Sequence, residues 1–132
     1  MLRQITNLRF ALLADAVASG ATGLMMIAGA DLLTGLLGLP AVLLGEAGLL
    51  LVPYVALVAF VGTRQAIPHG PVKAIIALNV AWVAGSIGLL MSGTVAPTAL
   101  GYAFVILQAV VVGVFAELQF IGLRREQTAT AY

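Results

Sequence analysis

The chain has 132 residues, of which 62% are hydrophobic and 8% are charged, and its mean hydropathy is +1.14. Because this small number of polar residues cannot cover the surface of a soluble domain, the composition predicts an integral membrane protein in contact with the lipid bilayer. A formal net charge of +1 without a basic patch argues against nucleic acid as a partner. The absence of cysteine excludes disulfides, thiolate nucleophiles and every cysteine-containing metal site.

Four apolar segments are long enough to cross a membrane core of about 30 Å. The first covers residues 8–30, and Asp15 is its only acidic residue. A helix continuing from it through Gly38 would be about 45 Å long. We therefore expect a break near Asp31, with Asp31 as the N-cap of a short interfacial helix over residues 32–38.

The other three spans are expected at residues 40–64, 71–93 and 97–125. Pro40, Pro71 and Pro97 stand at their starts, where the missing N–H of proline costs nothing. Pro53 falls inside the second span and should kink it. The predicted fold is an all-α membrane protein, a single domain over residues 1–132 in which four transmembrane helices form two αα-hairpins.

The basic residues predict the orientation of the chain. All six lysines and arginines fall near the N-terminus, between the second and third spans, or near the C-terminus. Under the positive-inside rule, both termini face the cytoplasm, as in a multi-pass protein of a bacterial inner (plasma) membrane. These residues are Arg3, Arg9, Arg64, Lys73, Arg124 and Arg125.

Two short stretches recur in the two halves of the chain. Residues 20–26 (GATGLMM) resemble residues 85–91 (GSIGLLM), and residues 59–64 (AFVGTR) resemble residues 119–124 (QFIGLR). Because each half would begin and end in the cytoplasm, these would be parallel repeats about an axis along the membrane normal. Chance likeness between glycine-rich apolar helices explains the pattern equally well.

Three polar side chains are expected to share one depth in the membrane. Asp15, Asn79 and Glu117 each lie six or seven residues inward from a basic residue of their own span, which is about 9–10 Å along a helix. The second span offers no polar side chain to this layer. Trp82 lies one turn deeper than Asn79, and its indole N–H needs an acceptor, which Asp15 or Gln108 could provide.

An intramembrane carboxylate is a functional-site hypothesis by default, because an ionised one is costly in lipid. Asp15 and Glu117 at one depth could share a proton. Alternatively, a protonated Asp15 bound to Asn79 would fasten the first span to the third. In a third interpretation, Arg9 or Arg124 reaches a carboxylate near the interface.

Other residues indicate where helices associate. The fourth span is two-sided, with Glu117 on one face and Gln108 and Gln119 on the opposite one. Whichever face does not look into the bundle must meet lipid or another protein, and glutamine in lipid is unfavourable. Association with a second copy or a larger membrane complex is therefore expected. Glycines that allow close helix approach in the first and third spans are Gly20, Gly23, Gly85 and Gly88.

In size and span number, the chain is similar to the small multidrug-resistance transporters, which use a carboxylate in their first span, and to small dual-topology fluoride channels. The likeness covers the number of spans and the position of Asp15. The aromatic and glycine surroundings of those families are absent, and the one-sided basic residues contradict dual topology. The chain looks more like small four-span proteins of bacteria, so no residue roles are carried over.

No nucleotide-binding loop and no nucleophile paired with a histidine inside the membrane occurs in the sequence. His69, the single histidine, is expected in a solvated loop, and no cofactor is expected. The sequence therefore favours a non-enzymatic accessory or assembly subunit. The alternative is a small homo-oligomeric proton- or ion-coupled transporter or channel that uses Asp15 and Glu117, and an intramembrane enzyme ranks third.

Overall fold

The computed structural model describes residues 7–130, which form five α-helices and no strand. Within this range, four helices are long and apolar enough to cross a membrane. They are α1 (Asn7–Ala28), α3 (Ala41–Gly62), α4 (His69–Ser92) and α5 (Ala99–Thr130), and the short α2 (Ala30–Leu37) follows α1. The predicted all-α fold with four spans and a short helix after the first is confirmed. Of the six basic residues used to predict the orientation, Arg3 lies outside the described residues.

The break between α1 and α2 falls at Gly29. Gly29 occupies the N-cap position of α2, whereas Asp31 lies in its first turn. The prediction that Asp31 caps this helix was therefore wrong, although a carboxylate in the first turn still interacts favourably with the helix dipole. At the other end Gly38 adopts a left-handed conformation with φ 71°, which glycine tolerates without a Cβ clash.

The end of α2 is tied to the start of α5 through Thr98. The Thr98 N–H donates to the Leu37 carbonyl at 2.9 Å, and its hydroxyl donates to the Leu36 carbonyl at 2.8 Å. The same hydroxyl accepts the Gly101 N–H at 3.1 Å, so Thr98 also caps α5. One residue thereby satisfies terminal backbone groups of both helices.

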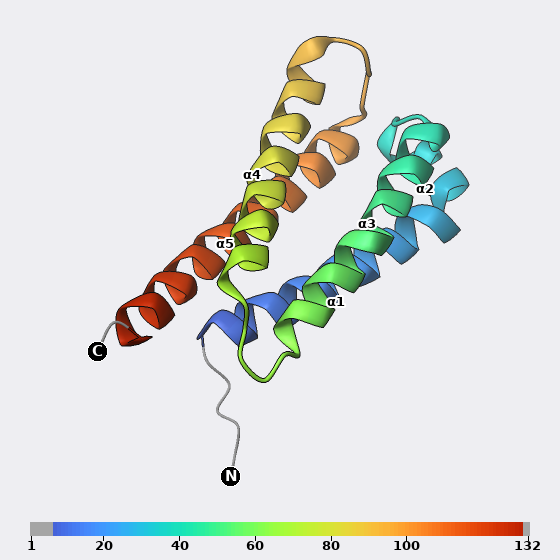
Figure 1. The fold of residues 1–132 in the computed structure, drawn as a ribbon. Helices are drawn as coiled ribbons and strands as arrows, with labels where there is room; N and C mark the ends of the chain where they lie inside the picture. Colours follow the sequence, from blue (N-terminus) through green and yellow to red (C-terminus); the bar gives the residue numbers. More distant parts are fainter. Residues whose placement is uncertain (1–6, 131–132) are drawn as a thin grey trace.

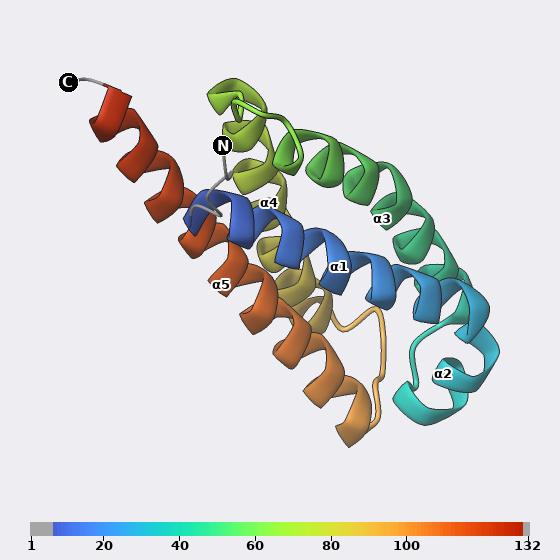
Figure 2. The same cartoon turned by 90° about the horizontal axis from the view of Figure 1, so that it is seen from below.

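The two hairpins lie beside each other (Figure 1), and α1 lies between α3 and α5 (Figure 2). The α1–α3 pair and the α4–α5 pair are the two predicted hairpins. They join mainly through α1 against α5, whereas the backbones of α3 and α4 come close at few positions. If the two halves of the chain were repeats related by a two-fold axis, α3 would pack against α4 as closely as α1 packs against α5. The α3–α4 contact is much smaller, so the two halves do not pack alike.

Glycines bring the helices close together at the crossings with α1. A Cβ atom on Gly48 of α3 would lie 3.0 Å from the Gly23 carbonyl oxygen of α1. A Cβ on Gly62 would lie 3.1 Å from the Leu12 Cβ, and one on Gly122 of α5 would lie 2.8 Å from the Leu8 Cα. Gly62 and Gly122 are equivalent positions in residues 59–64 and 119–124, so both copies of this recurring stretch use glycine to pack against α1.

One end of the bundle gathers the described basic residues; we call it the basic end. There the buried Arg9 donates to the Gly62 carbonyl at 2.6 Å and to the Gln65 carbonyl at 3.2 Å. The positive charge of the guanidinium interacts favourably with the negative, C-terminal end of the α3 dipole. His69 lies at the start of α4, with its Nε2 3.4 Å from a carboxylate oxygen of Glu126, rather than in a loop as expected.

Apolar side chains cover much of the outside of the bundle. Val17, Leu50 and Met91, from three different spans, are 73%, 65% and 80% exposed. Such surfaces contact the lipid bilayer in a four-span protein. The second span runs without interruption through Pro53, although its axis bends (Figure 2).

Candidate functional site

Each of the four spans contributes one polar side chain to a cluster inside the bundle. Asp15 of α1, Asn79 of α4 and Gln119 of α5 are 1%, 4% and 0% exposed, and Tyr54 of α3 is half-buried. We call these four residues the polar ring. Their side chains meet at the level where the first hairpin packs against the second.

The ring is closed by four short contacts. The Tyr54 hydroxyl oxygen lies 2.6 Å from Asp15 Oδ2 and also 2.6 Å from Asn79 Oδ1. The Asn79 amide nitrogen donates to Gln119 Oε1 at 2.9 Å, and the Gln119 amide nitrogen donates to Asp15 Oδ2 at 2.8 Å. Outside the ring, the Ser19 hydroxyl donates to Asp15 Oδ1 at 2.8 Å.

Asp15 is the acceptor that the ring shares. Its Oδ2 lies 2.6 Å from the Tyr54 hydroxyl, 2.8 Å from the Gln119 amide nitrogen and 3.3 Å from the Asn79 amide nitrogen. The Tyr54 hydroxyl has one hydrogen for its two oxygen neighbours, Asp15 Oδ2 and Asn79 Oδ1. If both contacts are hydrogen bonds, the second hydrogen comes from Asp15. We therefore predict that Asp15 is a neutral acid in the closed ring.

A neutral Asp15 would also suit the interior of a membrane bundle. The protonated form avoids the cost of placing an unpaired charge away from water. Hydrogen bonds between membrane helices stabilise a bundle by about 0.6 kcal/mol on average and by up to about 1.7 kcal/mol. Asp15 Oδ2 contacts both Tyr54 and Gln119, so this one oxygen links α1 to α3 and α5.

A second polar contact fastens α4 to α5 further from the basic end. The Trp82 indole N–H donates to Gln108 Oε1 at 2.7 Å, and the Gln108 amide donates to the Ser86 hydroxyl at 2.9 Å. Ser86 in turn donates to the Trp82 carbonyl at 2.8 Å. Of the two acceptors considered for Trp82, the structure uses Gln108.

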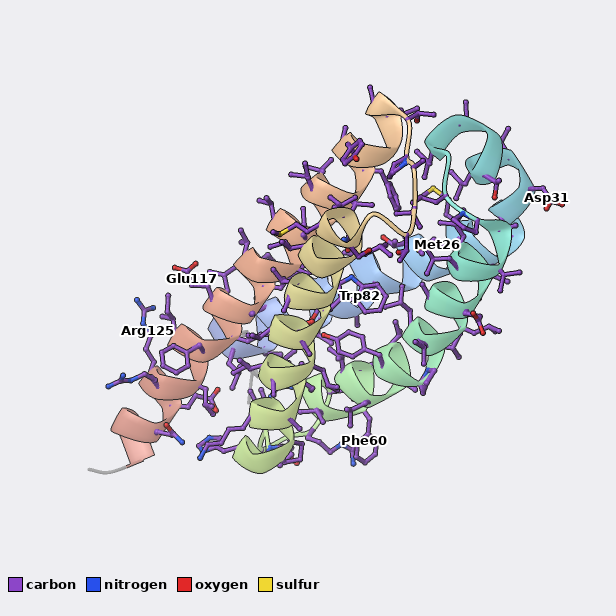
Figure 3. All side chains as sticks on the ribbon, turned by 90° about the horizontal axis from the view of Figure 1, so that it is seen from above. Met26, Asp31, Phe60, Trp82, Glu117 and Arg125 are labelled. Carbon is purple, nitrogen blue, oxygen red and sulfur yellow. The ribbon has the colours of Figure 1, made fainter. Side chains whose placement is uncertain are left out.

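The structure brings two of the three predicted layer residues together. Asp15 and Asn79 meet, but Glu117 lies exposed on the outer face of α5 and points away from the bundle (Figure 3). Gln119 takes its place. Two residues along a helix are about 200° apart, so α5 can turn only one of them inward. Gln119 offers both a donor and an acceptor, whereas a second carboxyl would need another proton.

The prediction that Glu117 joins the layer is therefore wrong. Of the two polar faces of α5, the one with Gln108 and Gln119 looks into the bundle, a choice that the sequence left open. Tyr54 was missed because its span reads as uniformly apolar and its Cα lies about one turn deeper than the layer. A phenol carries its hydroxyl far from the backbone and reaches the ring from there. Tyr54 could have been recognised in the sequence as an aromatic residue with a hydroxyl group, in a span that otherwise lacked a hydrogen-bonding partner for Asp15.

The four candidate glycines divide into two pairs. A Cβ on Gly23 would contact Leu51 at 3.1 Å, and one on Gly20 would contact Val55 at 3.8 Å, so both lie against α3. Gly85 and Gly88 have no atom of the described chain within 4 Å of such a Cβ. Only the first pair therefore joins helices within the chain.

Replacing Asp15 tests whether the ring requires a neutral hydrogen-bonding group. Asp15→Asn should keep the thermal stability of the wild type in detergent, because an amide offers both a donor for Tyr54 and an acceptor for Gln119. Asp15→Leu should lower stability by about 1–3 kcal/mol, since it leaves buried polar atoms without partners.

Asp31→Leu serves as the control, because Asp31 is an exposed acidic residue of α2. It should leave the unfolding temperature nearly unchanged. If Asp15→Asn destabilises the protein as much as Asp15→Leu, a neutral donor at this position does not hold the ring together.

Comparison of the chain with protein-family models, with curated proteins and with solved structures finds no match. The interpretation of the site therefore rests on its own geometry. That geometry is a ring of polar side chains that joins the two hairpins of a four-span membrane protein.

Proposed function

We propose that this protein is a non-enzymatic accessory or assembly subunit of the inner membrane, which binds helices of a second copy or of a larger complex. The observation that supports this most is an unpacked face of α4. Small residues occupy an arc of about 100° on that helix, and all of them are exposed. This small-residue face consists of Ala77, Ala81, Ala84, Gly85 and Gly88.

Small residues have a particular role in membrane helices. Lipid is as apolar as leucine, so helices associate through close packing rather than through the hydrophobic effect, and small residues let backbones approach. Within this chain, Gly23 and Gly48 already join α1 to α3 in this way. The same residue type on α4 has no neighbour in the described chain, which supports a role in binding another helix.

The alternative function, proton- or ion-coupled transport, would use Asp15 and Glu117 together. Asp15 is engaged in the closed ring, and Gln119, which binds it, lies on the side of α5 opposite to Glu117. A shared proton between the two carboxyl groups therefore has no support from this arrangement. The accessory role is the better supported of the two.

We also propose that the basic end faces the cytoplasm, with both termini. The described basic residues gather there from both hairpins, which strengthens the argument from the positive-inside rule. Reporter fusions at the C-terminus and at residue 67 should report the cytoplasm, and fusions after Gly38 or at Val95 the exterior. Mixed orientations in one membrane would contradict this topology.

Association through α4 is tested with bulky substitutions on the small-residue face. Gly85→Leu combined with Gly88→Leu should keep the fold, because both positions are open. It should weaken self-association or complex formation about tenfold or more, since each loss of about 1.4 kcal/mol of packing is a factor of ten. The measurement is resonance energy transfer between labelled copies in liposomes, together with native purification in mild detergent.

The matched control is Gly45→Leu, which fills an equally open position on α3. It should leave association unchanged. A protein that stays monomeric in liposomes, and that purifies alone whether or not Gly85 and Gly88 are replaced, would rule out the accessory role.

A further inference from the structure

The outer side of the α4–α5 hairpin carries an open groove of about 570 Å³ that the polar ring does not use. Its lining is apolar except for Glu117, the one ionisable residue among the described residues that line it. Gly113 and Ala116 of α5 form a floor of small residues, and Val80 and Phe120 stand at its rims, 56% and 48% exposed.

Glu117 lies inside the membrane-spanning part of α5. It is seven residues from Arg124, or about 10 Å along the helix axis from the basic end. Its side chain points away from the bundle (Figure 3), and it makes no hydrogen bond or ion pair with the described residues. A carboxylate in a transmembrane helix normally faces a protein interior or a paired group, because lipid solvates it poorly.

We propose that this groove receives a transmembrane helix of a partner protein that carries a lysine or arginine at the depth of Glu117. The proposal rests on the accessory role above and names the chemistry of the partner. The apolar floor and rims would take the apolar side chains of that helix. Its cation would pair with Glu117 where water is scarce and the attraction between opposite charges is strong.

Charge complementarity favours such a partner over a second copy. The described basic residues of this chain lie at the basic end, whereas Glu117 lies about 10 Å deeper along its helix. A second copy in the same orientation therefore brings no cation to this depth. A lipid chain would fill the groove but leave the carboxylate unpaired.

The test uses synthetic transmembrane peptides and the full-length protein in liposomes. The probe peptide has a leucine–alanine core with one lysine about 10 Å from the interface on the side of the basic end, and a charged tag fixes its orientation. One control peptide has leucine at that position, and another carries the lysine near the opposite interface. Energy transfer between labelled protein and peptide measures binding.

The wild type should bind the probe about tenfold or more tightly than either control peptide, as expected for a close charge pair. Glu117→Gln should abolish this preference. Glu46→Gln, which neutralises an exposed carboxylate on α3 outside the groove, should keep it. Gly113→Leu should weaken binding of the probe while leaving the carboxylate in place, because it fills the floor of the groove.

Equal binding of the three peptides by the wild type would overturn the proposal, as would a preference that survives Glu117→Gln. A dimer that forms without peptide and depends on Glu117 would assign the groove to a second copy instead. The peptide experiment and the test of the accessory role can fail independently. If the three peptides bind equally but association still depends on Gly85 and Gly88, the groove proposal is wrong and the accessory role stands. Circular dichroism of each variant confirms that the fold is retained.

Discussion

The two hairpins of this membrane protein are held together around one carboxyl group in an environment that penalises charge. Asp15 lies on α1, the helix that packs against both α3 and α5, and it is the shared partner of Tyr54 and Gln119. A neutral acid can both donate and accept, which an ionised carboxylate cannot, so a protonated Asp15 would close the ring and escape the cost of a buried charge. We expect the contact between the hairpins to depend on that state.

The rest of the bundle is arranged to bring α1 into this position. Gly62 and Gly122 let α3 and α5 approach α1 closely from two sides, and Arg9 caps the end of α3. The third span, α4, is different, because it reaches the ring through Asn79 but otherwise packs mainly along α5. Its outer surface therefore remains available, with the small-residue face and the Glu117 groove beside each other on the second hairpin.

The sequence was sufficient to predict the helices but not which way α5 faces. Long apolar runs and the prolines at their starts determine the spans, since only helices of this length satisfy the backbone in lipid. Both faces of α5 carry polar residues, so periodicity alone could not decide between Glu117 and Gln119. That choice depends on which side chain meets Asp15 and Asn79 once the four helices are assembled. Tyr54 was hidden for the same reason, because its role appears only when three other spans surround it.

The most direct test of this account is the infrared spectrum of the protein in lipid at neutral pH. A neutral Asp15 predicts a carbonyl stretching band of a protonated carboxylic acid that disappears in Asp15→Asn and persists in Glu117→Gln. If Asp15→Asn leaves that band unchanged and instead removes intensity from the carboxylate band, Asp15 is ionised. The closed ring would then lack one of its four hydrogens, and the account of how the two hairpins are joined would be wrong.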